Sequence, residues 1–231
     1  MTAIRFSEKT IGTSRYYRFQ ERHLTLGYTA CGFDKSLFPS IFPDTKTLEL
    51  KQVHSDIILQ ASQINGEMAG DGIILDKADT VAIIRTADCT PLFFFSDEAN
   101  PPVAGILHIG WRGLQAGIEK RLLDQIDCER SSLQFILGHS IEGACYEVGE
   151  DLVKQFSKKQ YIKKDPDLVF HRSGDRITMD VKQGIILSLT EEGILKEQIE
   201  NVPICTRCHP DLPSYRQDKT SERIYNFMVL K

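Results

Sequence analysis

Long apolar runs are missing from this chain of 231 residues, and their absence narrows what the protein can be. No stretch approaches the roughly 20 apolar residues that a bilayer-spanning helix needs, so we expect no contact with the membrane interior. Residues 1–17 are too polar, and carry too many arginines, to contain the apolar core of a signal peptide. These two absences predict a cytoplasmic protein.

Positive charge is not in excess either. The chain has 28 lysine and arginine residues against 32 aspartate and glutamate residues, which gives a formal net charge of -4 at pH 7. Proteins that hold nucleic acid through a general basic surface carry clustered positive charge instead. We therefore expect no nucleic-acid partner, although a local basic pocket is compatible with this balance.

Cysteine is too sparse for a disulfide scaffold in a chain of this length. Disulfides are rare in the reducing cytoplasm, so the cysteines are interpreted as free thiols or metal ligands. The six are Cys31, Cys89, Cys128, Cys145, Cys205 and Cys208. Internal repeats, low-complexity tracts and linker-like segments are also missing, which predicts one domain over residues 1–231.

The apolar pattern predicts a mixture of strands and helices. Short β-prone runs at residues 81–84, 91–95 and 103–108 predict buried strands, which we expect to share one sheet. Further expected elements are a helix at 114–126, a strand at 133–137, helices at 150–159 and 181–192, and a terminal strand and tail at 214–231. Because the strands cluster rather than alternate with helices, the fold class predicted is α+β with mixed sheets.

Three motifs close to these runs each contribute one nitrogen or sulfur donor: His54, Cys89 and His108. They are far apart in sequence, so no local turn could form the site and the sheet must bring them together. Structural zinc sites use four protein ligands, whereas three leave a position open for water or substrate. The pattern therefore favours a catalytic zinc, which lowers the pKa of bound water to about 7.

Two other interpretations of the same residues stay open. A histidine after an apolar strand is commonly a hydrogen-bonded core or turn residue, and a free cysteine is commonly a small buried apolar residue. Cys89 could also be a nucleophile that His108 activates. Asp88 fits that alternative poorly, because a neighbouring carboxylate raises the pKa of a thiol.

The segment from Cys205 to His209 has the Cys-x-x-Cys-His pattern of c-type haem attachment. Such haem proteins are normally exported, and the chain shows no export signal. A zinc half-site at Cys205 and Cys208 lacks an obvious second pair, although Cys128 and Cys145 could be recruited. We expect a structural turn before the last strand.

Taken together, six motifs resemble those of the YfiH family in order and spacing, from about Lys51 to Arg216. They are Lys51-Gln52-Val53-His54, Asp71-Gly72, Thr86-Ala87-Asp88-Cys89-Thr90-Pro91, His108-Ile109-Gly110-Trp111-Arg112-Gly113, Cys145-Tyr146-Glu147-Val148-Gly149 and Ser214-Tyr215-Arg216. The resemblance implies a layered α/β/β/α sandwich. It also implies one zinc per chain, held by His54, Cys89 and His108, with copper less expected.

Members of this family carry a laccase label but are also described as zinc-dependent purine nucleoside phosphorylases with adenosine deaminase activity. The resemblance thus implies adenosine, inosine, guanosine or methylthioadenosine and orthophosphate as partners, in a monomer or small homo-oligomer. A multicopper oxidase commonly has histidines two positions apart on a strand. The six histidines lack such a pair, being His23, His54, His108, His139, His171 and His209. The zinc deaminase signature, His-x-Glu followed by Pro-Cys-x-x-Cys, is missing too.

Phosphorolysis needs cations for phosphate and groups that orient the metal centre and the base. Arg112 and Arg216 are candidates for binding phosphate, and Asp71 and Asp88 for orienting a ligand imidazole or metal-bound water. The remaining substrate-binding candidates are Lys51, Gln52, Trp111 and Tyr146. Each has a structural alternative: a surface charge, a turn, or an aromatic ring packed in the core.

Three segments depart from the family pattern. Residues 138–144 lack the family's Gly-Pro elements, Pro213 and Gln217 replace a phenylalanine and a second arginine, and residues 220–223 replace Thr-Gly-Arg. These changes leave substrate choice more open than metal binding. Two alternatives to the phosphorylase therefore remain: an editing hydrolase for peptidoglycan precursors that uses the same zinc ligands, and a redox or partner-binding protein with Cys89 as its reactive thiol.

Overall fold

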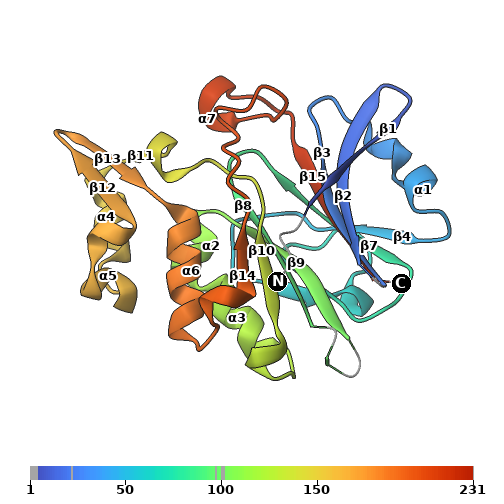
Figure 1. The fold of residues 1–231 in the computed structure, drawn as a ribbon, viewed down its shortest axis with the longest axis horizontal. Helices are drawn as coiled ribbons and strands as arrows, with labels where there is room; N and C mark the ends of the chain where they lie inside the picture. The colour runs from blue at the N-terminus through green and yellow to red at the C-terminus, as the bar shows by residue number, and fades with distance from the viewer. Residues whose placement is uncertain (1–4, 22, 97, 100–101, 231) are drawn as a thin grey trace.

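Two six-stranded sheets form the centre of the molecule (Figure 1). The computed structural model describes residues 5–21, 23–96, 98–99 and 102–230, and the rest of the expected 1–231 domain lies outside the described residues. The first sheet has the order β1 (Ser7–Ile11), β2 (Ser14–Glu21), β3 (Leu24–Thr29), β15 (Ile224–Leu230), β7 (Thr80–Thr86) and β4 (Lys46–Glu49). The second has the order β14 (Ile199–Asn201), β10 (Gln134–Leu137), β8 (Thr90–Ser96), β9 (Val103–Ile109), β6 (Gly72–Leu75) and β5 (Ile58–Gln60).

Both sheets are mixed. In the first sheet β4 and β7 are parallel, while β15 is antiparallel to both of its neighbours. In the second, β5 pairs with β6 and β10 with β14 in parallel, and β8 is antiparallel to β9 and β10. The predicted fold class, α+β with mixed sheets, is confirmed.

The strands at the centre are buried on both faces. On β8, Phe93 and Phe95 belong to the core between the two sheets, whereas Leu92 and Phe94 belong to the core on the outer face of the second sheet. This alternation follows from the two-residue period of a strand. On β7, Val81 likewise packs away from the second sheet, with aromatic residues of the α1 region.

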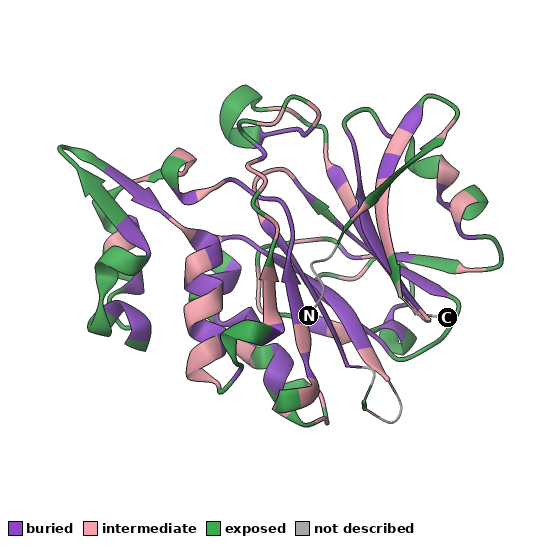
Figure 2. Cartoon of the chain, viewed as in Figure 1, coloured by how far each residue is buried: buried purple, intermediate pink, exposed green. Residues whose placement is uncertain are grey.

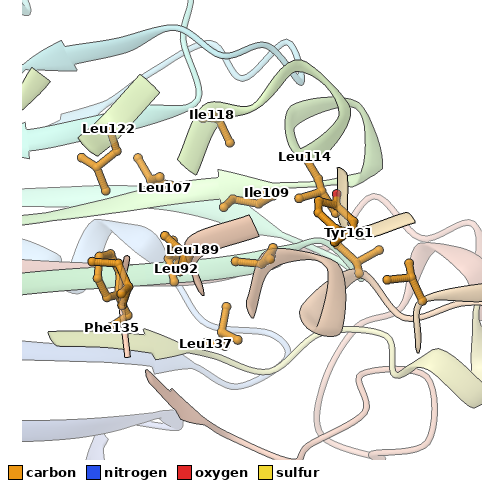
Figure 3. Packing of buried hydrophobic residues seen from close by; sticks show 14 of the residues in the cluster. Leu92, Leu107, Ile109, Leu114, Ile118, Leu122, Phe135, Leu137, Tyr161 and Leu189 are labelled. Carbon is orange, nitrogen blue, oxygen red and sulfur yellow. The ribbon is translucent and has the colours of Figure 1, made fainter. Parts of the chain in front are cut away.

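Helices cover the outer face of the second sheet. Leu114 of α2 (Trp111–Ala116), Ile118 of α3 (Ile118–Gln125) and Leu189 of α6 (Val181–Glu191) share one apolar core with Leu92 and Leu107 (Figure 3). The outer face of the first sheet packs against the short helix α1 (Phe38–Ile41). The order of layers is thus α/β/β/α, as the resemblance implies.

The expectation of a single sheet for the runs at 81–84, 91–95 and 103–108 was wrong. The first run is β7, in the first sheet, whereas the other two are β8 and β9, in the second. A strand buried on both faces has the same continuous apolar run in either sheet, so composition could not separate the two positions. Residues 87–89 carry the chain from one sheet to the other, with Asp88 at a φ of 90°.

The helix predicted at 114–126 is interrupted. Gly117 has a φ of +86°, which ends α2 and starts α3, although the apolar side chains keep their predicted face. The helix predicted at 150–159 ends early, at Phe156. Within 214–231 a short helix, α7 (Tyr215–Asp218), precedes strand β15, and residue 231 lies outside the described part. No helix within the described ranges is long and apolar enough to cross a membrane.

A small three-stranded sheet stands beside α6 at the left of Figure 1. Its order is β11 (Glu147–Val148), β13 (Arg176–Met179) and β12 (Phe170–Ser173), and it carries α4 (Glu150–Phe156) and α5 (Gln160–Lys164). Phe156 and Phe170 join the same core as the helices on the second sheet, while the outward surface is largely exposed (Figure 2). Asp180 directly follows β13 and caps α6, so the small sheet continues straight into that helix.

Glu119 is a charged group inside the contact between α3 and α6. Its side chain is fully buried, Oε1 accepts a hydrogen bond from Ser188 at 2.5 Å, and Oε2 has no partner among the described residues. Burial raises the pKa of Glu119, and the hydrogen bond from Ser188 opposes that shift only in part. The folded protein therefore releases the proton of Glu119 at a higher pH than the unfolded chain does.

We expect Glu119→Gln to stabilise the protein more at about pH 8 than at about pH 5. A carboxyl with a raised folded pKa contributes stability at low pH, and this is lost as the pH rises from about 4.3, the unfolded value, through the folded pKa. Glutamine does not ionise, so the variant keeps that stability. Melting temperatures of both proteins at the two pH values test this, with the exposed Glu129→Gln as control. An equal shift at both pH values would refute the role of ionisation.

Candidate metal centre and its pocket

His54, Cys89 and His108 meet at one end of the two sheets. Their donor atoms all lie within 4.8 Å of one another, with 3.8 Å between His54 Nε2 and Cys89 Sγ. The two imidazole rings are edge to face, with centroids 4.7 Å apart. His54 follows β4, Cys89 lies in the turn between β7 and β8, and His108 is on β9. Segments distant in sequence thus supply the three donors, as a metal site of this kind requires.

Asp71 holds two of these three residues in place. It immediately precedes β6, its side chain is fully buried, and its Oδ1 lies 2.8 Å from His108 Nδ1. Its carboxylate also accepts hydrogen bonds from the backbone of His54 at 3.0 Å and of Ser55 at 2.6 Å. Burial alone would raise the pKa of Asp71, but the hydrogen bonds from His108 and Ser55 lower it to about 2. An ionised Asp71 makes Nδ1 the donor and leaves Nε2 of His108 for a metal.

His54 has a φ of 59°, in the left-handed region that few residues other than glycine adopt. The hydrogen bonds that the His54 and Ser55 amides donate to the Asp71 carboxylate stabilise this turn. Strained backbone of this kind persists where the surrounding structure fixes it, often at functional sites. The Asp71 carboxylate therefore also supports the motif that carries His54.

Cys89 is surrounded by groups that favour its thiolate. Burial alone would raise its pKa, but His108 and His54 lower it to about 6. Burial likewise disfavours the imidazolium of His108, yet Cys89 and Asp71 raise its pKa to about 9. The thiolate is the form that binds a metal and also the form that acts as a nucleophile. These electrostatics are therefore compatible with both sequence interpretations of Cys89.

Gly110 has no side chain, so the space beside the donors of Cys89 and His54 stays open. A Cβ atom there would lie 2.9 Å from Cys89 Sγ, closer than packing allows, and would make a tight contact of 3.1 Å with His54 Cδ2. The glycine of the Gly110-Trp111-Arg112-Gly113 turn is thus required by the approach of backbone to the donors. One thiolate and two imidazoles form a donor set that suits zinc, and the residues present fit such an ion.

A cavity of about 890 Å³ opens from the three donors. Its wall carries five cationic side chains, and Asp88 is the one acidic residue among the lining residues that the structure describes. The cations are Arg85, Arg112, Arg216, Lys219 and Arg223. This local basic pocket in a chain of net charge -4 suits an anionic ligand of moderate size.

The predicted site residues divide into those at this cavity and those away from it. The cavity is lined by Gln52, His54, Cys89, His108, Trp111, Arg112, Tyr146 and Arg216. Asp71 lies behind the histidines. Lys51 does not line the cavity, and its Nζ is 3.9 Å from Glu67 at the surface. The expected contact of Lys51 with substrate therefore has no support in this geometry.

Several lining residues also have structural partners. The side-chain amide of Gln52 donates to the carbonyl of Arg85 and accepts from its N–H, both at 2.8 Å. The guanidinium of Arg112 stands 4.3 Å above the Trp111 ring, and that of Arg216 stands 4.9 Å above the Tyr146 ring. Each aromatic ring thus orients a cation. The sequence predicted these rings and cations as separate site residues, without the contact between them.

Asp88 orients neither histidine through the hydrogen bonds of its carboxylate. It accepts from Thr206 Oγ1 at 2.8 Å and from the backbone N–H of Arg216 at 2.6 Å. The expectation that Asp88 positions an imidazole is thus replaced by a different contact. Asp88 joins the turn that carries Cys89 to the segment that carries Arg216, and Thr206 gives the Cys205–His209 segment its place beside the site.

Three pocket residues were not predicted from the sequence: Arg85, Lys219 and Arg223. Arg85 had a signal, because it is the single charge in the apolar run of β7 and directly precedes the Thr86-Ala87-Asp88-Cys89 motif. Lys219 and Arg223 lie between α7 and β15 in irregular structure, where no periodicity predicts side-chain direction.

Comparison with known proteins extends these observations. The family model described as multi-copper polyphenol oxidoreductase laccase matches residues 37–231. The Aquifex aeolicus protein named purine nucleoside phosphorylase is 31% identical over 181 residues, covering 78% of this chain and 80% of its own. A Borreliella burgdorferi protein of the same name is 28% identical over 227 residues, covering 93% and 96%.

Solved structures show the same fold. The Bacillus licheniformis hypothetical protein YfiH superposes with a TM-score of 0.82 at 19% identity, covering 94% of this chain and 96% of its own. YlmD from Geobacillus stearothermophilus gives a TM-score of 0.81 at 21% identity, with 98% of each chain covered. The chain therefore belongs to the multi-copper polyphenol oxidoreductase laccase family, and its predicted membership of the YfiH group is confirmed.

Proposed function

We propose that this protein is a zinc-dependent purine nucleoside phosphorylase, with adenosine, inosine, guanosine and methylthioadenosine as the substrate class. The observation that carries the proposal is a single cavity in which the His54, Cys89 and His108 donors face five cationic side chains. The name that the curated relatives share supports the same reaction. A cavity of about 890 Å³ has room for a nucleoside and an orthophosphate together.

Phosphorolysis adds orthophosphate to the anomeric carbon of the ribose while the glycosidic bond to the purine breaks. Positive charge develops on the ribose and negative charge on the departing base, so the phosphate must be held and oriented beside the sugar. Arg216 and Arg112 suit this task, because one guanidinium can donate two parallel hydrogen bonds to two phosphate oxygens. An aromatic ring also orients each of these guanidinium groups. Purine stacking on Trp111 or Tyr146 remains a prediction.

Zinc held by His54, Cys89 and His108 would supply a Lewis acid on the cavity wall. Asp71 keeps the proton of His108 on Nδ1 and holds the backbone of His54, so both imidazoles are oriented before substrate binds. Gly110 leaves the metal centre open to the cavity. Adenosine deamination is proposed as a second activity of this centre, in which water attacks C6 of the purine, the bond from C6 to the amino nitrogen breaks and ammonia leaves.

The test measures zinc content and the release of base from adenosine, inosine and methylthioadenosine, with and without orthophosphate. About one zinc at this centre and phosphate-dependent release of base support the proposal. Zinc without nucleoside cleavage would refute the substrate class. Release of ammonia without release of base would make deamination the main reaction, and cleavage of a peptidoglycan-type amide would favour the editing hydrolase. A metal-free protein with a reactive Cys89 would favour the thiol-based alternative.

We expect Arg216→Ala to lower kcat/KM for orthophosphate by about 10- to 150-fold, which corresponds to about 1.5–3 kcal/mol for a lost charged hydrogen bond. The guanidinium carries the charge that holds phosphate, so most of the loss should appear in the KM for phosphate and little in zinc content. Arg172→Ala is the matched control, because Arg172 pairs with Glu150 on the small sheet and lies outside the cavity. Unchanged phosphate kinetics in Arg216→Ala would contradict the assignment.

A further inference from the structure

Three cysteines form a second cluster that the proposed reaction does not use. The sulfur atoms of Cys145, Cys205 and Cys208 all lie within 4.8 Å of one another, and those of Cys145 and Cys208 are 3.4 Å apart. The other three cysteines of the chain are outside this cluster: Cys31, Cys89 and Cys128. The structure thus recruits Cys145, and not Cys128, to the Cys-x-x-Cys half-site seen in the sequence.

Backbone pairing holds the two segments together. Ser140 and Cys205 form an isolated parallel bridge, in which Thr206 N donates to the Ser140 carbonyl at 3.0 Å. Arg207 adds a side-chain hydrogen bond at 3.1 Å to the carbonyl of Cys145. The segments that carry the three sulfur atoms are therefore held together by a main-chain bridge and by the Arg207 side chain.

The Cys205–Cys208 turn has the features of a metal knuckle. The carbonyl of Cys205 accepts from Cys208 N at 3.2 Å and from His209 N at 3.0 Å, which closes the turn. Cys205 Sγ accepts a hydrogen bond from Glu142 N at 3.4 Å. Burial alone would raise the pKa of Cys205, but this bond and the backbone amides of Cys208 and Arg207 lower it. Amide donors of this kind stabilise the thiolate, which is the form that binds a metal cation.

Repulsion between the three neighbouring thiolates favours a cation bound among them. The pKa of Cys145 is raised to about 12 by burial and by its closeness to Cys208 and Cys205. A second and a third thiolate beside the first cost repulsion energy, and a cation bound among them removes that cost. Soft thiolates select zinc or copper(I) and disfavour calcium and magnesium.

We propose that Cys145, Cys205 and Cys208 form a second metal site that binds Zn²⁺, separate from the centre at His54, Cys89 and His108. The Cys-x-x-Cys spacing is that of one half of a zinc site, and Cys145 adds a third thiolate from another segment. Three protein ligands leave one tetrahedral position for a water molecule. A metal at this site would link the 142–146 loop to the 205–209 turn. Tyr146 in that loop contacts Arg216, and Thr206 in that turn donates a hydrogen bond to Asp88.

The test counts metal in the full chain, purified under reducing conditions and loaded with Zn²⁺ alone. We expect two zinc ions per wild-type chain, one in Cys208→Ser, one in Cys145→Ser and two in the control Cys128→Ser. Cys208 is exposed, so serine there is compatible with folding. Cys89→Ala should also hold one zinc, because it loses only the first centre.

Cobalt substitution identifies which centre is lost. Sulfur-to-cobalt absorption grows with the number of thiolates bound, and the proposal gives three to the second site and one to the first. Cys89→Ala should therefore keep most of the wild-type band, and Cys208→Ser should lose most of it. A single zinc in both wild type and Cys208→Ser would overturn the proposal. So would a wild-type mass lower by two hydrogen atoms, located to a Cys145–Cys208 disulfide.

Discussion

Cys89→Ala is expected to lose the metal of the first centre and, with it, phosphate-dependent release of purine base. Cys89 supplies the one sulfur among the three donors, and His54 and His108 alone leave a two-ligand site. Loss of a partner behind a ligand already costs about 10- to 100-fold in metal affinity, so loss of the ligand itself should cost more. Metal analysis of the purified protein and assay of base release measure both effects.

The matched control is Cys128→Ala, because Cys128 is a partly buried cysteine outside both candidate metal sites. It should keep wild-type metal content and turnover. Loss of activity in Cys89→Ala with metal content unchanged would favour Cys89 as a nucleophile over Cys89 as a ligand. Unchanged metal and unchanged activity would overturn the assignment of Cys89 altogether.

Asp71→Asn is expected to weaken both the metal centre and the fold. The Asp71 carboxylate accepts hydrogen bonds from the N–H groups of His54, Ser55 and His108. The NH₂ group of asparagine is itself a donor, so it cannot accept from all of these N–H groups. Breaking a buried charged pair costs about 3–5 kcal/mol, and loss of a carboxylate behind a metal-binding histidine costs about 10- to 100-fold in metal affinity. Denaturant unfolding and competitive zinc titration measure these two effects separately.

Asp76→Asn provides the comparison at the other end of the same strand. Asp76 directly follows β6, is exposed, and accepts one hydrogen bond from Ser62 N at 2.9 Å. Its replacement should change stability by about 1 kcal/mol and leave zinc affinity unaltered. If Asp71→Asn and Asp76→Asn behaved alike, the role of Asp71 behind the histidines would be refuted.

The fold class could be predicted because it depends on local pattern, and the three candidate donors could be singled out because their motifs also resemble those of the YfiH family. The strand around Phe93 is continuously apolar, and Cys89 and His108 lie beside such runs in recognisable motifs. The partition of strands between sheets could not be predicted in the same way. A strand such as β7 is apolar on both faces whichever sheet it joins, and only long-range pairing decides the matter.

Contacts that depend on the folded geometry could not be predicted from the sequence either. Asp71 was a candidate, but nothing in its motif indicated that its carboxylate accepts from both the His54 and the Ser55 amides. Arg223 occupies an irregular segment, so its position at the cavity follows from tertiary packing alone. Cys145 is far from Cys208 in sequence, and the bridge at Ser140 that brings their segments together has no sequence signature.

The passage of the chain between sheets has a consequence for how this protein can evolve. His54 lies between β4 of the first sheet and β5 of the second, and Cys89 lies between β7 and β8, which are divided in the same way. The spacing of the donors is thus set by how the two sheets stack, through core residues such as Phe93. Exchanges of volume in that core would move the donors relative to one another, so selection for activity constrains side chains that never meet a substrate.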